Sequence, residues 1–166
     1  MAADDAYYWA GGHKVPLSAS PDVVVDLASA AVAPLESTQV DALRAAGRTL
    51  SGALLLVART DAVAALGEEG TSGPGVHPVF RSADDSLVVV LPEVRVEASD
   101  PVRLAELVRG LTTAHIKEES ADRLVLEPDS GRGEDALALA NTLSESTDAD
   151  LVQARFLRVV PRPGPR

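Results

Sequence analysis

Periodic patterns of apolar and polar residues are clearest in the second half of the chain. Residues 93–97 alternate polar and apolar side chains, which is typical of a strand with one face in water. The segment Ser99-Asp100-Pro101 then supplies an N-cap and a first-turn proline, and apolar residues follow at helical spacing over 104–111. Short apolar runs at 113–118 and 123–127 predict two further strands.

The pattern ends with a helix predicted over 133–144 and a strand over 151–160. Residues 93–160 therefore predict strand, helix, strand, strand, helix, strand, which is the ferredoxin-like βαββαβ order. Right-handed crossovers place both helices on one face of a four-stranded antiparallel sheet. The other face of that sheet is expected to be open to a partner.

The first half has shorter elements. Two runs around Gly11-Gly12 predict a β-hairpin over 7–17, because both central positions of such a turn need positive φ. A strand, a helix, a strand and a short helix are then expected at 22–27, 36–46, 50–57 and 60–66. The apolar run at 50–57 suggests a strand buried on both faces.

These elements predict an α+β chain in four parts. Gly, Pro and Ser residues at 67–75 mark the internal boundary. The parts are a small α/β region with an N-terminal β-hairpin (1–75), a connecting β-hairpin (76–92), a ferredoxin-like domain with an antiparallel sheet (93–160), and a Pro/Arg tail (161–166).

Composition narrows the possible partners. The chain is 46% hydrophobic but only 3% aromatic, so its core must use Val, Leu and Ala. The net charge is −10, and a basic face of the kind that nucleic acids need is not evident, so no nucleic-acid partner is expected. Neither a signal peptide in residues 1–12 nor a membrane-spanning apolar run is found, and we expect a cytoplasmic protein.

Residues that would carry chemistry are scattered. The chain has no cysteine, and His13, His77 and His115 lack the close spacing of metal ligands. No Gly-x-Ser-x-Gly motif occurs, and residues 131–135 are better explained by helix capping than by phosphate binding. The sequence therefore predicts a protein that is not an enzyme and binds no cofactor or metal.

Several segments resemble the propeptides of bacterial subtilisin-like serine proteases. Residues 77–81 with 86–90, followed by 93–97, resemble the entry to such propeptides, and 135–143 with 150–160 are similar to their last helix and last strand. The opening Tyr7-Tyr8-Trp9 with Lys14-Val15-Pro16-Leu17 is similar to segments that precede propeptides in larger bacterial members. One departure is Gln153-Ala154-Arg155, where the family often has an acidic residue, proline and asparagine.

The resemblance implies a module that inhibits a subtilisin-like protease or assists its folding. In that family the sheet packs on two helices of the protease, and the C-terminal extension lies along the active-site cleft. Residues 159–166 would correspond to this extension, and their prolines would make them extended and hard to cleave. An ordinary Pro-rich end is the alternative. The candidate partner-binding residues are Phe156, Arg158, Val160, Pro161, Arg162, Pro163, Tyr7, Tyr8 and Trp9.

Two other functions are compatible with the same patterns. The chain could be an adaptor or structural module of a bacterial multi-protein system, with no effect on proteolysis. It could also be a ferredoxin-like regulator that binds a small molecule at a dimer interface. For the aromatic run Tyr7-Tyr8-Trp9, a hydrophobic plug on the sheet is an alternative to a peptide-binding patch.

Overall fold

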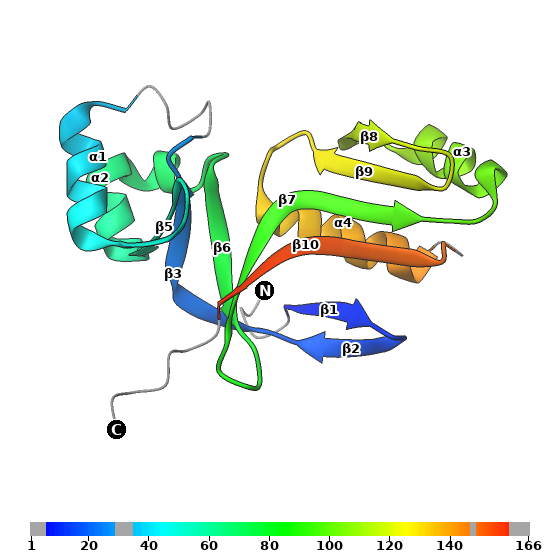
Figure 1. Ribbon diagram of the computed structural model, residues 1–166, viewed down its shortest axis with the longest axis horizontal. Helices are drawn as coiled ribbons and strands as arrows, with labels where there is room; N and C mark the ends of the chain where they lie inside the picture. The colour runs from blue at the N-terminus through cyan, green and yellow to red at the C-terminus, as the bar shows by residue number, and fades with distance from the viewer. Residues whose placement is uncertain (1–5, 29–34, 147–148, 160–166) are drawn as a thin grey trace.

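The structure is a computed structural model that describes residues 6–28, 35–146 and 149–159 (Figure 1). It is an α+β fold, as the sequence predicts, and every strand pair in it is antiparallel. An N-terminal hairpin is formed by β1 (Tyr7–Ala10) and β2 (His13–Pro16). Gly11 and Gly12 turn it with φ of 57° and 80°, which confirms the predicted hairpin.

The remaining strands form one 8-stranded sheet with two groups of helices. We call the first group of elements the first unit: β3 (Ser18–Asp26), α1 (Ser37–Ala46), β4 (Arg48–Ser51), β5 (Leu54–Ala58), α2 (Arg59–Thr71) and β6 (Val76–Arg81). We call the second group the second unit: β7 (Leu87–Glu97), α3 (Pro101–Gly110), β8 (Ala114–Glu119), β9 (Arg123–Pro128), α4 (Gly133–Ser146) and β10 (Leu151–Val159).

The two units have the same order of elements and the same strand pairing. The first unit pairs its strands in the order β4-β5-β3-β6, and the second pairs them as β8-β9-β7-β10. In each unit, the first strand therefore lies between the third and the fourth. The sequence patterns indicated this order only in the second unit, so the repetition is a finding of the structure.

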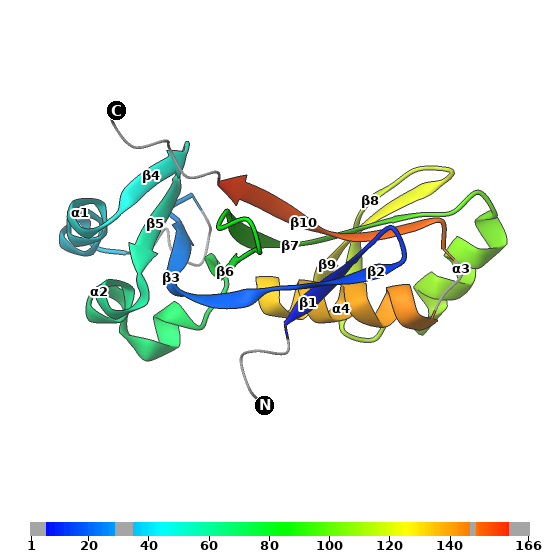
Figure 2. The same cartoon turned by 90° about the horizontal axis from the view of Figure 1, so that it is seen from below.

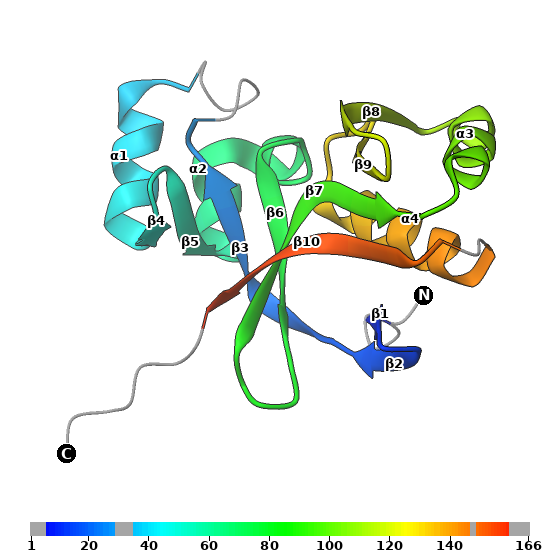
Figure 3. The same cartoon turned by 45° about the vertical axis from the view of Figure 1, so that its right-hand side comes forward.

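Strand β7 belongs to both units. Residues 87–89 pair with β6, residues 94–97 pair with β9, and β10 pairs along the other edge of β7 (Figures 1 and 3). The sequence predicted two separate strands on either side of Pro92. The structure shows one strand, because Pro92 falls where pairing with β6 has ended and pairing with β9 has not begun. A proline without an N–H group is tolerated at such a gap.

Two elements of the first unit differ from the predictions because of glycine. The single strand expected at 50–57 is two strands, β4 and β5, separated by a turn in which Gly52 has φ of 53°. Leu55 and Val57 are buried, but Leu54 and Leu56 are half-buried, so the expectation of burial on both faces was too strong. The helix expected at 60–66 continues to Thr71 through a kink at Gly67, where φ is 79°.

Each unit has a core between its sheet and its helices. In the first unit, Val23, Val25 and Leu55 pack against Leu43 of α1 and Ala62 of α2. In the second unit, α3 and α4 pack on the same sheet face. Their contacts there are Leu104 from α3, Leu137 and Leu143 from α4, and Val94, Val96, Leu124 and Leu126 from the sheet.

The start of α4 packs closely on the point where the units join. A Cβ atom on Gly133 would lie 2.1 Å from the carbonyl oxygen of Val90 and 2.7 Å from Cδ of Pro78. Both neighbours belong to strands of the sheet, so neither can move cheaply. Only glycine therefore allows α4 to begin at this place.

We expect Gly133→Ala to lower the free energy of unfolding by about 2 kcal/mol or more, because the added methyl group forces α4 away from β7. Gly110→Ala is the matched control. Its Cβ would meet no atom within 4 Å, and alanine is the better helix former, so stability should be unchanged or slightly higher. Urea unfolding followed by circular dichroism measures both changes. Equal midpoints for the two variants would contradict the close packing described above.

Candidate functional site

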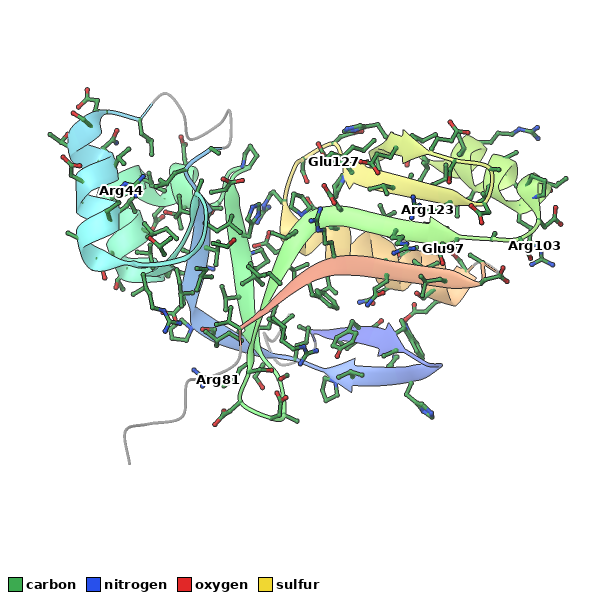
Figure 4. The ribbon with its side chains drawn as sticks, viewed as in Figure 1. Arg44, Arg81, Glu97, Arg103, Arg123 and Glu127 are labelled. Atoms are coloured by element: carbon green, nitrogen blue, oxygen red, sulfur yellow. The ribbon has the colours of Figure 1, made fainter. Side chains whose placement is uncertain are left out.

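Among the residues that the structure describes, no helix covers one face of the second unit's sheet. Along β7, Val94 and Val96 point to α4, whereas Glu93, Arg95 and Glu97 occupy the opposite face. The adjoining strands complete this surface, which we call the open face. Its residues are Glu93, Arg95, Glu97, Lys117, Arg123, Val125, Glu127, Gln153 and Arg155. Figure 4 labels Glu97 on β7 and Arg123 and Glu127 on β9.

Glu93 is the central charged group of the open face. Only 16% of its side chain is exposed, and its two carboxylate oxygens accept hydrogen bonds from different strands. Lys117 Nζ of β8 donates to Oε1, and Arg155 Nη1 of β10 donates to Oε2 at 2.8 Å. This one carboxylate therefore ties the side chains of three strands together.

These contacts shift the pKa values of both partners. Burial by itself would raise the pKa of Glu93, but the hydrogen bonds from Lys117 and Arg155 outweigh burial, so the pKa lies below its ordinary value of 4.5. The hydrogen bond to Glu93 raises the pKa of Lys117. Both groups are thus charged at neutral pH, and the ion pair is maintained over a wide pH range.

Further polar contacts surround this centre. Lys117 Nζ lies 3.7 Å from Glu127 Oε2, and His115 Nδ1 lies 2.8 Å from Asp129 Oδ1. Arg95 pairs with Glu97 on the same strand. Arg123 makes no ion pair with any residue that the structure describes, although it lies opposite Glu97 in the β7–β9 register.

Two hollows lie on this side of the molecule. The first, which we call the junction cleft, has a volume of about 430 Å³ and lies where the two units meet. Its lining includes His77, Leu54, Leu91, Pro92 and Asp26, together with Glu93, Lys117, Glu127 and Arg155. The second, which we call the depression, has a volume of about 540 Å³ and lies over β7, β8, β9 and β10.

His77 is an unusual group in the junction cleft. The residue is only 4% exposed, and its Nδ1 atom has no hydrogen-bond partner among the described residues. Burial lowers the pKa of His77, and the nearby charge of Asp26 only partly opposes this effect. The ring is therefore neutral at pH 7 and retains unused hydrogen-bonding capacity.

The structure brings three of the sequence-predicted residues together. The rings of Tyr8 and Phe156 meet edge to face, with centroids 4.9 Å apart, and Arg158 Nη2 donates to Tyr8 Oη at 3.3 Å. Arg158 Nη1 also donates to Ser86 Oγ at 3.2 Å. Tyr8 and Phe156 pack at the border of the second unit's core, so they connect the hairpin to the body of the protein.

Tyr7 and Trp9 alternate with Tyr8 along β1 and so lie on the other side of the hairpin. Strand β1 lies beside α4 (Figure 2). Tyr7 Oη and Trp9 Nε1 both donate to Glu145 Oε1, at 2.7 and 3.2 Å, and Lys14 Nζ lies 4.5 Å from the centre of the Tyr7 ring. The hydrogen bond to Glu145 raises the pKa of Tyr7. The other predicted residues, Val160, Pro161, Arg162 and Pro163, lie outside the described residues.

Sequence patterns missed the residues that organise the open face. The alternation over 93–97 indicated that Glu93 would be on the wet face, but nothing local connects it with Lys117 or Arg155. The pairing of β7 with β9 and β10, and of β9 with β8, creates these contacts. The only usable signal was the opposite charge of residues on strands predicted to share a sheet.

The described residues include no cluster of three or more His, Asp or Glu side chains that could hold a metal ion. Among the same residues, no helix is long and apolar enough to cross a membrane. Comparisons with family models, curated proteins and solved structures return no match to this chain.

We expect Glu93→Gln to lower the free energy of unfolding by about 1 kcal/mol at pH 7, because Lys117 and Arg155 lose their shared carboxylate. The pKa of Glu93 is lower in the folded state, so the carboxylate stabilises the fold above pH 4.5 and this contribution is lost as the pH falls further. The difference between the variant and the original chain should therefore shrink in acid. Urea unfolding at pH 7 and pH 3 measures it.

Glu69→Gln serves as the control, because Glu69 is exposed on α2 and far from these cations in the sequence. Its substitution should have little effect at either pH. A deficit of the Glu93 variant that is the same at pH 3 as at pH 7 would show that the ion pairs do not stabilise the fold.

Proposed function

We propose that this chain is a non-catalytic protein-binding module of the subtilisin-propeptide kind, which inhibits a subtilisin-like serine protease or assists its folding. The observation that carries the proposal is the open face, which β7, β8, β9 and β10 build and which no helix of the described residues covers (Figure 4). The pairing order β8-β9-β7-β10 supports a ferredoxin-like topology for the second unit.

In this proposal the open face packs against the surface of the protease. Strands β7, β8, β9 and β10 present it as one rigid surface, because the Glu93 ion pairs fix the side chains of three of these strands. Residues 160–166 follow directly after β10 and would reach the active-site cleft. The spacing of their prolines would oppose cleavage, since proline removes backbone donors and fixes φ.

The aromatic hairpin has a supporting role in this proposal. Tyr8 already contacts Phe156 and Arg158, and Tyr7 and Trp9 already contact Glu145. These contacts favour the hypothesis that the aromatic residues are a hydrophobic plug that holds β10 and α4. They are less compatible with a free patch that binds a partner. Phe156 and Arg158 would then act on the partner by holding β10, the strand from which the tail extends.

The direct test is inhibition of subtilisin, used as a representative of the protease class. We expect the purified chain to inhibit hydrolysis of a chromogenic peptide with an inhibition constant in the micromolar range or below. Removal of residues 160–166 should weaken inhibition at least tenfold, because the tail would no longer occupy the cleft. Circular dichroism of the shortened chain checks that the fold is retained.

Trypsin provides the control, since it is a serine protease with an unrelated fold. Equal inhibition of trypsin would indicate a non-specific effect. Binding to subtilisin without any change in proteolysis would favour the adaptor function instead. An inhibition constant that is unchanged after removal of residues 160–166 would contradict insertion of the tail.

A further inference from the structure

The two hollows on the open side of the molecule adjoin each other. The junction cleft and the depression share Glu93, Lys117 and Arg155 as lining residues. Each hollow is too small for a protein domain, but together they offer a continuous concave path from the first unit across the second. A surface of this kind suits an extended segment of a partner.

The charge of the depression is opposite in sign to that of the whole protein. Four basic residues line it, whereas only two acidic residues do, in a chain with a net charge of −10. The basic residues are Arg95, Lys117, Arg123 and Arg155, and the acidic residues are Glu93 and Glu118. The excess is confined to the depression, because the junction cleft adds the acidic residues Asp26 and Glu127. Within the depression it favours an anionic ligand.

Two of the arginines have donors to spare. Arg123 has no ion pair with a described residue, and Arg155 contacts Glu93 through Nη1 alone while 64% of its side chain is exposed. A guanidinium group has five N–H donors and binds a carboxylate through two parallel hydrogen bonds. Both side chains can therefore donate hydrogen bonds to a carboxylate without losing an existing contact.

The walls between these charges are partly apolar. Val125 is half-buried in the depression, and Leu54, Leu91 and Pro92 line the junction cleft. His77, with its unused hydrogen-bonding capacity, also faces this cleft. Apolar walls do not favour a polyphosphate, and the negative charge of the protein as a whole repels nucleic acids.

We propose that this concave surface binds an acidic segment of a protein, with carboxylates on Arg123 and Arg155 and apolar side chains against Val125 and the wall of the junction cleft. The inference rests on the proposed function and deepens it, because it states the chemistry of the partner surface that the open face recognises. A basic or uncharged segment would leave Arg123 without an ion-pair partner among the described residues and the spare donors of Arg155 unused.

The first test compares two labelled peptides on the full chain. One is a hexapeptide of alternating leucine and glutamate, and the other has glutamine in place of each glutamate. We expect fluorescence anisotropy to show at least tenfold tighter binding of the glutamate peptide. Raising the salt concentration from 50 to 500 mM should weaken that binding, because exposed ion pairs are screened. Equal affinities for the two peptides, or binding of neither, would overturn the proposal.

The second test locates the site with matched arginine variants. The double variant Arg123→Met with Arg155→Met should bind the glutamate peptide roughly tenfold more weakly. Arg44→Met with Arg109→Met removes the same charge from exposed positions on α1 and α3 and should leave the affinity unchanged. An equal loss in both double variants would mean that net charge alone attracts the peptide, and the site would be rejected.

Two further measurements keep the outcomes separate. Circular dichroism checks that the variants fold, and the single variant Arg123→Met replaces the double one if it does not. Inhibition of subtilisin by a chain that binds no acidic peptide would overturn this inference and leave the proposed function in place. Peptide binding without inhibition of subtilisin would overturn the proposed function and leave the binding of an acidic segment in place.

Discussion

Backbone pairing along β7 is the constraint on which the rest of the structure depends. Strand β10 pairs with one edge of β7 from Leu87 to Glu97, while β6 and β9 share the other edge. The two units are therefore joined by a continuous sheet and not by a linker alone. The close approach of Gly133 to Val90 fixes α4 at the same place, so the helix layer and the sheet are positioned by one short region.

The side chains on the face of β7 opposite α4 also differ between the two units. On the face opposite α4, Leu87, Val89 and Leu91 are followed by Glu93, Arg95 and Glu97. In the first unit this face is largely self-covered, because half-buried leucines surround the buried valines Val24, Val79 and Val89. In the second unit it is charged and open. The second unit thus offers the open face on which both proposals rest, and the first unit adds its side of the junction cleft.

Local sequence was a good guide to the elements whose signals are local. The Gly11-Gly12 turn, the Asp100-Pro101 helix start and the alternation over 93–97 each reflect a backbone or burial requirement of a few neighbouring residues. Asp100, for example, accepts a hydrogen bond from the backbone N–H of Val102, as an N-cap does. The α+β class followed from these elements.

Features that depend on pairing between distant strands could not be predicted in this way. The apolar run 50–57 contains a turn at Gly52. Pro92 indicated the end of a strand, but β7 continues through it, because β6 and β9 pair with β7 on either side of Pro92 and no N–H is needed there. The repeated order of β3 to β6 was hidden by the shortness of β4 and β5. The contacts of Glu93 likewise appear only once β9 and β10 pair with β7 and β8 pairs with β9.

The position of β10 has a consequence for the timing of folding during synthesis. All strands and helices of the first unit have been made once the ribosome has passed Arg81, so that unit can begin to pack while the chain is still growing. The second unit must wait for residues 151–159, which supply one whole edge of β7. Until then that edge lacks its partner, so a nascent chain that pauses after α4 presents an unpaired strand edge that can pair with a neighbouring molecule.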